Sequence, residues 1–229
     1  MEQLPNGYTL NIPKDQFPLS TDSMLLSGFV KLPRQAQVLD LGAGCGTLGL
    51  LLCAKDPECT VTGLEISEVA HRAAEENIAA NNLFHRMSSI CGDIRQARRL
   101  LKPGTFDVCV SNPPYFSGGP ASPSLASARK DDLCNTTELF SAAGWALRYG
   151  GDFFLVHRPE KLAFLCSEAS KVRLEPKRLC LIRHKPDAPV SLILLQCRKG
   201  GKPGLAWEEI CLFDELGNPG THYRTLDHI

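Results

Sequence analysis

The sequence has no apolar run that could cross a membrane. Its longest apolar stretches are far shorter than the ~20 residues that a membrane-spanning helix needs. Residues 1–7 also lack the cationic start and apolar stretch of a secretory signal. The sequence therefore predicts a cytoplasmic protein that has no membrane partner.

Net charge is also absent, and aromatic side chains are scarce. The 25 Lys and Arg balance the 25 Asp and Glu, and aromatic residues make up 7% of the chain. No signature of an RNA-binding module such as an RRM or KH domain is present. Electrostatics of the whole molecule therefore do not indicate a nucleic-acid partner, and any such partner must be recognised by local charge.

The ten cysteines lack the spacing of a metal site or a disulfide framework. No two of them form a CxxC pair, and no His and Cys residues cluster at the spacing of zinc ligands. Most lie inside apolar runs, as Cys109 and Cys197 do. The pattern predicts small core residues in a reducing compartment and no bound metal.

The pattern that is present is an alternation of short apolar runs with helical segments, in a chain of 229 residues that suits one α/β domain. It predicts a doubly wound, mostly parallel sheet of seven strands. The last two strands have only a polar turn between them, which predicts an antiparallel hairpin at one edge of the sheet. Residues 1–36 are expected to form an extension packed on a domain of residues 37–229. The expected strands are 37–41, 60–65, 88–91, 106–111, 152–157, 178–183 and 190–197, and the expected helices are 46–55, 68–82, 93–101, 137–149 and 159–170.

A glycine-rich turn, Asp40-Leu-Gly-Ala-Gly-Cys-Gly46, follows the first strand, at the edge where open α/β sheets bind ligands. Glycines such as Gly42 and Gly44 allow the backbone to turn tightly and to approach a ligand closely. Asp40 can accept hydrogen bonds from loop amides or contact an ammonium group of the ligand. A nicotinamide-binding GxGxxG pattern also fits residues 44–49, so the turn alone leaves the cofactor open.

Two further carboxylates end the next two strands. Glu65 can accept both hydroxyls of a ribose, and Asp93, with Ile94 beside it, can accept a hydrogen bond from an adenine amino group. A nucleoside-containing cofactor therefore fits the first three strand ends.

The sequence Ser111-Asn-Pro-Pro-Tyr115 ends the fourth strand and indicates chemistry at an amino nitrogen. The Asn112 side-chain oxygen and the Pro113 carbonyl can accept the two hydrogens of an NH2 group and aim its lone pair at an electrophile. Consecutive prolines, Pro113 and Pro114, fix the backbone so that both acceptors are in place before the substrate arrives. Tyr115 offers a face on which a planar base can stack.

Together these residues resemble the amino-methyltransferase class that includes DNA adenine methylases, HemK-type protein glutamine methyltransferases and tRNA or rRNA adenine methylases. Within this class the chain is most similar to the bacterial tRNA1(Val) (adenine-N6)-methyltransferase family, which modifies the adenine beside the anticodon. The similarity also covers Phe17-Pro-Leu-Ser-Thr-Asp-Ser-Met-Leu-Leu26, Ala128-Arg129, Val156-His-Arg-Pro-Glu160 and Leu174-Glu-Pro-Lys-Arg178. Lys130 is a departure, because the family usually has His there.

The resemblance implies an S-adenosylmethionine-dependent methyltransferase domain with a Rossmann-like fold at residues 37–229. It implies methyl transfer to N6 of a tRNA adenine near the anticodon. It further implies that S-adenosylmethionine is bound by Asp40, Gly42, Glu65, Asp93 and Asn112, together with Thr21.

Local charge supports an RNA substrate, because residues 157–202 contain eleven basic and four acidic residues, a net charge of +7. Candidate substrate contacts are Arg129, Lys130, Lys177 and Arg178. Two alternatives stay open, a protein glutamine methyltransferase and a non-catalytic RNA-binding relative. The glutamine enzyme is disfavoured because fewer than 40 residues precede Asp40, and the four intact polar residues of the pocket disfavour the non-catalytic protein. DNA methylation is disfavoured because no insertion is large enough to recognise a DNA target, and the oligomeric state is not predicted.

Overall fold

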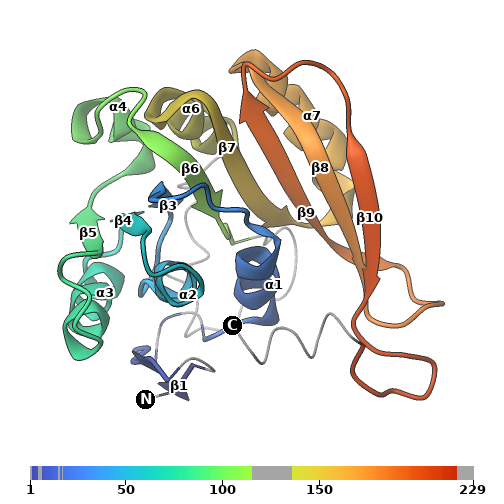
Figure 1. Ribbon diagram of the computed structural model, residues 1–229, viewed down its shortest axis with the longest axis horizontal. Helices are drawn as coiled ribbons and strands as arrows, with labels where there is room; N and C mark the ends of the chain where they lie inside the picture. Colours follow the sequence, from blue (N-terminus) through green and yellow to red (C-terminus); the bar gives the residue numbers. More distant parts are fainter. Residues whose placement is uncertain (1, 5–6, 15, 17, 115–135, 221–229) are drawn as a thin grey trace.

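The computed structural model describes residues 2–4, 7–14, 16, 18–114 and 136–220, and its main feature is an eight-stranded sheet with helices on both faces (Figure 1). The strand order is β10-β8-β9-β7-β6-β3-β4-β5. The elements are β1 (Glu2–Gln3), β2 (Thr9–Leu10), α1 (Thr21–Phe29), β3 (Gln37–Leu41), α2 (Thr47–Lys55), β4 (Thr60–Glu65), α3 (Glu68–Ala80), β5 (Met87–Cys91), η1 (Ile94–Gln96), α4 (Ala97–Leu100), β6 (Phe106–Ser111), α6 (Thr136–Ala146), β7 (Leu147–His157), η3 (Pro159–Lys161), α7 (Leu162–Lys171), β8 (Leu174–Arg183), β9 (Val190–Lys199) and β10 (Ala206–Cys211).

Strands β3 to β7 run parallel, so their carboxyl ends meet at one edge of the sheet. Alternate residues of each strand enter different cores because successive side chains point to opposite faces. Val110 and Phe154 pack with α1 and α2, whereas Cys109 and Phe153 pack with α6 and α7. Burial on both faces explains why these strands are nearly continuous apolar runs. No helix among the described residues is long and apolar enough to cross a membrane.

The sheet confirms the predicted α/β class, with antiparallel pairing near the C-terminus, but the predicted strand count and edge were wrong. An eighth strand, β10, pairs in parallel with β8, so the β8–β9 hairpin lies inside the sheet. β10 was missed because the side chains of Ala206–Cys211 are mostly exposed and two consecutive glutamates interrupt the apolar residues. It is held instead by backbone pairing and by two ion pairs, Glu208 with Arg178 and Glu209 with Arg183.

The predicted helix 137–149 was too long, since α6 ends at Ala146 and β7 already begins at Leu147. The register between β6 and β7 shifts between Phe106 and Val108, which accommodates the extra residues of β7. Within this irregular stretch, Asp107 accepts hydrogen bonds from the Gln37 amide at 2.8 Å and from Arg148. The strand therefore extends through the two glycines that were expected to end the helix.

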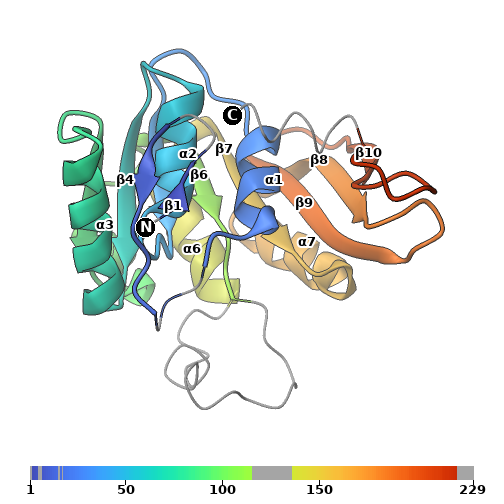
Figure 2. The same ribbon diagram turned by 90° about the horizontal axis from the view of Figure 1, so that it is seen from below.

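Residues before β3 contact both the sheet and α3. The small β1–β2 hairpin lies beside α3 (Figure 2), where the Asn81 side chain accepts from the Thr9 amide at 2.8 Å and Asn77 accepts from the Asn11 amide at 2.7 Å. Helix α1 ends near Lys55, whose ammonium group donates to three backbone carbonyls at the helix C-terminus. The division of the chain at residue 36 stays a prediction.

Candidate active site

The predicted pocket residues come from four neighbouring strands and meet at the carboxyl edge of the sheet. Asp40 on β3 lies in register with Gly63 of β4 and Val110 of β6, and Glu65 on β4 pairs with Cys91 of β5. Asn112 directly follows β6, and Asp93 lies two residues after the end of β5. The topology therefore assembles residues that are far apart in the sequence at the edge where open α/β sheets bind ligands.

The glycine turn takes a backbone conformation that other residues rarely adopt. Gly42 and Gly44 have φ of 75° and 54°, and the Gly44 amide donates to Glu65 Oε2 at 2.8 Å. A Cβ atom at either position would meet nothing within 4 Å. The space on the concave side of the turn is therefore open to a ligand, and glycine is required here by φ.

Asp40 is a buried acid whose pKa departs far from its ordinary value. It is 2% exposed, and its Oδ2 atom has no hydrogen-bond partner among the described residues. Burial, together with the nearby charge of Glu65, raises the pKa of Asp40 to about 7. A buried carboxylate without a partner is costly, so the position is suited to a cationic ligand group.

Glu65 and Asp93 are already engaged by backbone amides. Glu65 Oε1 accepts from the Ser67 amide at 2.8 Å, and its other oxygen holds the glycine turn. Asp93 accepts from the amide and the Nε of Arg95, both at 2.8 Å, and this lowers the pKa of Asp93. Both groups are thus fixed in orientation and retain lone pairs for further donors.

A small pocket joins these groups, and part of its apolar lining was missed from the sequence. Ile66, which is 45% exposed, lies directly after Glu65 and is the clearest omission. The sequence could have indicated Ile66, because the residue that follows the last residue of a parallel strand lies at the same carboxyl edge of the sheet. The pocket is lined by Gly42, Leu64, Glu65, Ile66, Gly92, Asp93 and Ile94.

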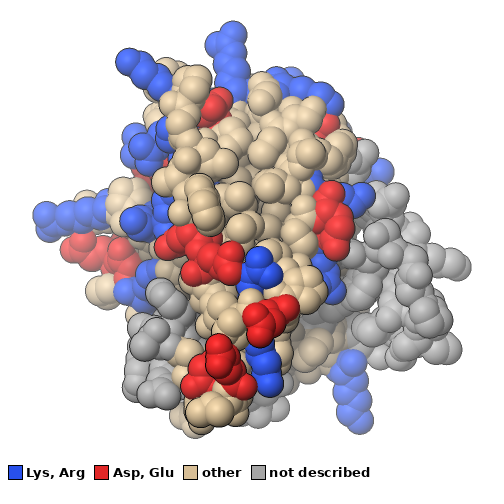
Figure 3. Space-filling model, turned by 90° about the vertical axis from the view of Figure 1, so that its right-hand side faces the viewer, with Lys and Arg blue, Asp and Glu red and all other residues tan. Residues whose placement is uncertain are grey.

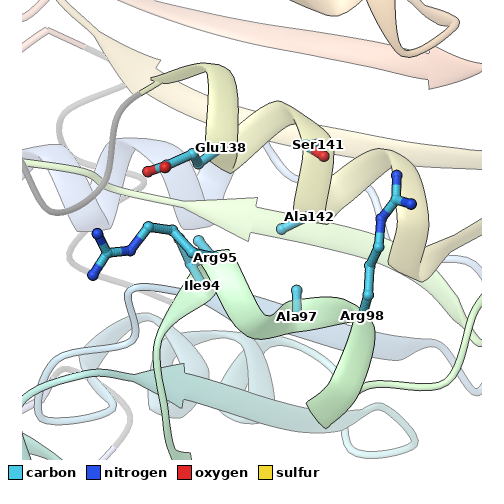
Figure 4. A pocket seen from close by; sticks show the side chains of 7 residues that line it. All are labelled: Ile94, Arg95, Ala97, Arg98, Glu138, Ser141 and Ala142. Atoms are coloured by element: carbon cyan, nitrogen blue, oxygen red, sulfur yellow. The ribbon is translucent and has the colours of Figure 1, made fainter.

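A second pocket shares Ile94 with the first and extends between η1–α4 and α6 (Figure 4). Arg95 and Glu138 extend toward the same side of this pocket, while Arg98 lies at its other end, 5.1 Å above the Trp145 ring. Small side chains, Ala97 and Ala142 among them, line its middle. The second pocket therefore adjoins the first at Ile94 and lies against α4 and α6.

Asn112 is fixed by a helix that precedes the sheet. Its Nδ2 donates to Ser23 Oγ at 2.9 Å, and Ser23 is 7% exposed in α1. Ser20 caps that helix by accepting a hydrogen bond from the Ser23 amide. On the other side of the contact, Ser111, the residue before Asn112, donates to the Leu41 carbonyl at 2.7 Å. Sequence reasoning missed Ser23, although it lies within the segment that resembles the family.

Of the remaining predicted residues, some lie beside Asn112 or Ser23 and others are not described by the structure. Thr21 is the first residue of α1, two positions before Ser23, and Pro113 and Pro114 continue the chain from Asn112. Tyr115, Arg129 and Lys130 lie outside the described residues.

Lys177 and Arg178 make their contacts within the protein and are not brought to Asn112. Lys177 Nζ donates to the Lys202 carbonyl at 2.9 Å. The Arg178 guanidinium lies 4.2 Å from the centre of the Phe29 ring and donates to the Phe29 carbonyl at 3.3 Å. Arg178 thus ties α1 to β8.

The cysteines that the structure describes are free thiols, and within the described ranges no three His, Cys, Asp or Glu residues are placed to hold a metal ion. Burial raises the pKa of Cys109 and that of Cys180, which suits thiols that serve as core residues.

The family model of the methyltransferase small domain matches residues 19–164, well over half of the chain. The chain belongs to the methyltransferase small domain family. This methyltransferase is 30% identical over 190 residues to a protein of Bacteroides fragilis, with 82% of this chain and 80% of the relative covered. It is also 30% identical over 213 residues to a protein of Pseudoalteromonas translucida, covering 91% and 88%. Both relatives are named tRNA1(Val) (adenine(37)-N6)-methyltransferase, so the predicted family is confirmed.

Solved structures confirm the Rossmann-like methyltransferase fold. A predicted O-methyltransferase from Agrobacterium tumefaciens, Atu636, superposes with a TM-score of 0.76 at 20% identity, covering 90% of this chain and 95% of that one. A methyltransferase from Pyrococcus furiosus gives a TM-score of 0.64 at 21% identity, covering 85% and 90%.

Proposed function

We propose that this methyltransferase transfers the methyl group of S-adenosylmethionine to N6 of an adenine in tRNA, next to the anticodon. The names of the two bacterial relatives support the substrate, and the position of Asn112 at the end of β6 supports the chemistry. The observation that carries the proposal is the placement of the Asn112 amide, held by Ser23, on the strand next to that of Asp40, whose Oδ2 has no hydrogen-bond partner among the described residues.

The pocket fits the cofactor by the chemistry of its donors and acceptors. S-adenosylmethionine supplies a methyl group on a positively charged sulfonium and also carries an ammonium group. Asp40 binds a cationic part of it, Glu65 accepts from ribose hydroxyls, and Asp93 accepts from the adenine amino group. The proposed set is Thr21, Asp40, Gly42, Gly44, Glu65, Asp93, Ile94 and Asn112, to which the structure adds Ile66 as an apolar surface for the base.

The target nitrogen needs help because its lone pair is delocalised into the adenine ring. The Asn112 oxygen and the Pro113 carbonyl accept the two N6 hydrogens and favour a pyramidal nitrogen whose lone pair is available. The hydrogen bond from Asn112 Nδ2 to Ser23 orients the amide before substrate binds, so little reorganisation is needed during transfer. Pro114 stiffens the loop, and Tyr115 is proposed to stack on the extruded base.

The test is to incubate the purified chain with labelled S-adenosylmethionine and total bacterial tRNA, and to analyse the nucleosides by mass spectrometry. We expect N6-methyladenosine in the tRNA fraction, and an initial rate of its formation about 100-fold lower with the Asn112→Ala variant. Label that enters only protein would instead favour a glutamine methyltransferase. An absence of label in both fractions would reject catalysis.

A further inference from the structure

Ten of the eleven basic residues of segment 157–202 lie toward two opposite ends of the sheet, and Arg178 lies in the middle of β8. β7 and β8 run in the same direction as β6, and β9 runs in the opposite direction. The end of β7 and the turn between β8 and β9 therefore lie at the edge that carries Asn112. The start of β8 and the end of β9 lie at the far edge. Arg158, Lys161, Arg183 and Lys185 are near the site, whereas Lys171, Arg173, Lys177, Arg198, Lys199 and Lys202 are remote from it.

Many cations away from the site edge are committed to contacts within the protein. At the far edge, Arg198 pairs with Asp152 at 2.8 Å, and Lys199 Nζ donates to the Leu147 carbonyl at 2.6 Å. At the site edge itself, on the side of the molecule that carries β10, Arg183 also pairs with an acid, Glu209, at 2.6 Å. Figure 3 shows this side, where basic side chains near the centre adjoin acidic ones and a broad uncharged area lies above them. These contacts reduce the positive charge that the segment offers to a polyanion.

Two further cations, Arg158 and Lys161, lie just beyond the end of β7, at the site edge. Arg158 is exposed, and its Nη1 donates to the Ser191 carbonyl at 3.0 Å, which holds the side chain over the start of β9. Ser111 pairs with Leu155, so the backbone of Arg158 lies on the order of 10 Å from that of Asn112, given the rise and spacing of strands. Lys161 follows in η3 and is also exposed.

An aromatic ring and a third cation extend this surface. Phe164, one helical turn after Lys161, is 43% exposed. Lys185 lies in the exposed turn after β8, and the Ser191 hydroxyl, which donates to the Ile182 carbonyl at 3.2 Å, links the ends of the two strands. Exposed cations beside an exposed aromatic ring are the combination with which proteins bind phosphates and unstacked bases of RNA.

Charge differs between the two halves of the site edge. The cofactor half presents the carboxylates of Glu65, Glu68 and Asp93, of which the last two pair with Arg72 and Arg95. Among the described residues, the β7–β8 half has Arg158, Lys161 and Lys185 against the exposed acids Glu160 and Asp187, besides Arg183, which pairs with Glu209. A polyanion that approaches Asn112 is thus favoured on the β7–β8 half.

We infer that Arg158, Lys161, Phe164 and Lys185 form the surface that holds the phosphate backbone and a neighbouring base of the tRNA substrate. This inference rests on the proposed function and identifies where the RNA binds. Lys177 and Arg178, the contacts predicted from the sequence, are not part of this surface, because they lie in the first half of β8, away from the site edge.

A pair of charge-matched double variants tests the surface. Arg158→Gln with Lys161→Gln removes one Arg and one Lys near the site. Arg173→Gln with Lys202→Gln removes the same two residue types at the far edge, where both residues are exposed. Initial rates on purified tRNA are measured from about 50 to 200 mM salt, a range over which phosphate contacts change affinity strongly. A thermal shift with S-adenosylhomocysteine verifies that each variant is folded and binds the cofactor product.

For the site-edge pair we expect KM for tRNA to rise by about 10-fold at 150 mM salt, and the slope of log KM against log salt to fall by about 1.4 to 1.8, because two phosphate contacts are lost. The far-edge pair should retain the KM and slope of the unmodified protein. Equal effects of the two pairs, or no effect of the site-edge pair, would refute the inference that this surface binds tRNA. If the unmodified protein forms no N6-methyladenosine in tRNA, the proposed function fails; if it does and the site-edge pair behaves normally, only this inference fails.

Discussion

Asp40 allows the cofactor site to be tested through folding stability as well as through binding. Its pKa is raised from 3.8 to about 7, mainly by burial and further by Glu65. The unfolded chain therefore loses this proton near pH 4, whereas the folded protein keeps it up to about pH 7. Because the folded state binds more protons in this window, stability must fall as the pH rises from about 4 to 7, and then level off.

The size of the effect follows from the two pKa values. A pKa that moves from 3.8 to about 7 corresponds to about 4 kcal/mol of unfolding free energy. The Asp40→Asn substitution keeps the size of the side chain and removes its titration. We expect this variant to be more stable than the unmodified protein by about 4 kcal/mol at pH 8, and the difference to vanish near pH 4. The variant should also bind S-adenosylmethionine more weakly, since a neutral amide attracts a cation less.

Urea denaturation between pH 4 and 8.5, without ligand, measures the stability difference, and titration calorimetry measures cofactor affinity. Glu76→Gln serves as the control, because Glu76 is exposed and its removal should leave the pH dependence unchanged. A stability difference that stays constant over the whole pH range would refute the raised pKa of Asp40. Unchanged affinity for the cofactor would refute its binding role.

Three further substitutions separate chemistry, positioning and structure. Asn112→Ala should lower kcat by about 100-fold and lower S-adenosylhomocysteine affinity far less, because the other cofactor contacts remain, as measured by single-turnover kinetics and calorimetry. Ser23→Ala should lower kcat by about 10-fold without raising KM for tRNA, and Ser23→Thr, which keeps the hydroxyl, should restore it; failure of this rescue would assign Ser23 a packing role only. Arg178→Ala should reduce the unfolding free energy by about 2 kcal/mol in urea denaturation, through loss of the contacts with Phe29 and Glu208, and leave the salt dependence of tRNA binding unchanged. A weaker salt dependence of tRNA binding in that variant would instead show that Arg178 contacts the RNA.

The parallel strands were predictable because burial on both faces requires continuous apolar runs, as in Phe106–Ser111. β10 escaped because an edge strand is stabilised by backbone pairing and ion pairs, and these leave no apolar pattern in its sequence. The boundary between α6 and β7 was predicted wrongly for a related reason. The register shift opposite Asp107 depends on a neighbouring strand, which local helix signals do not describe.

The sequence by itself determined the fold class and the residues that follow each strand, because strand ends, glycine turns and the Asn-Pro-Pro segment are local patterns. Tertiary structure alone decided which side chain orients Asn112, since Ser23 lies 89 residues earlier in the chain and approaches it only when α1 packs on the sheet. Tertiary structure also decided where the cations of residues 157–202 lie. The cations follow one another along the sequence, but strands that run in opposite directions carry them to opposite ends of the sheet.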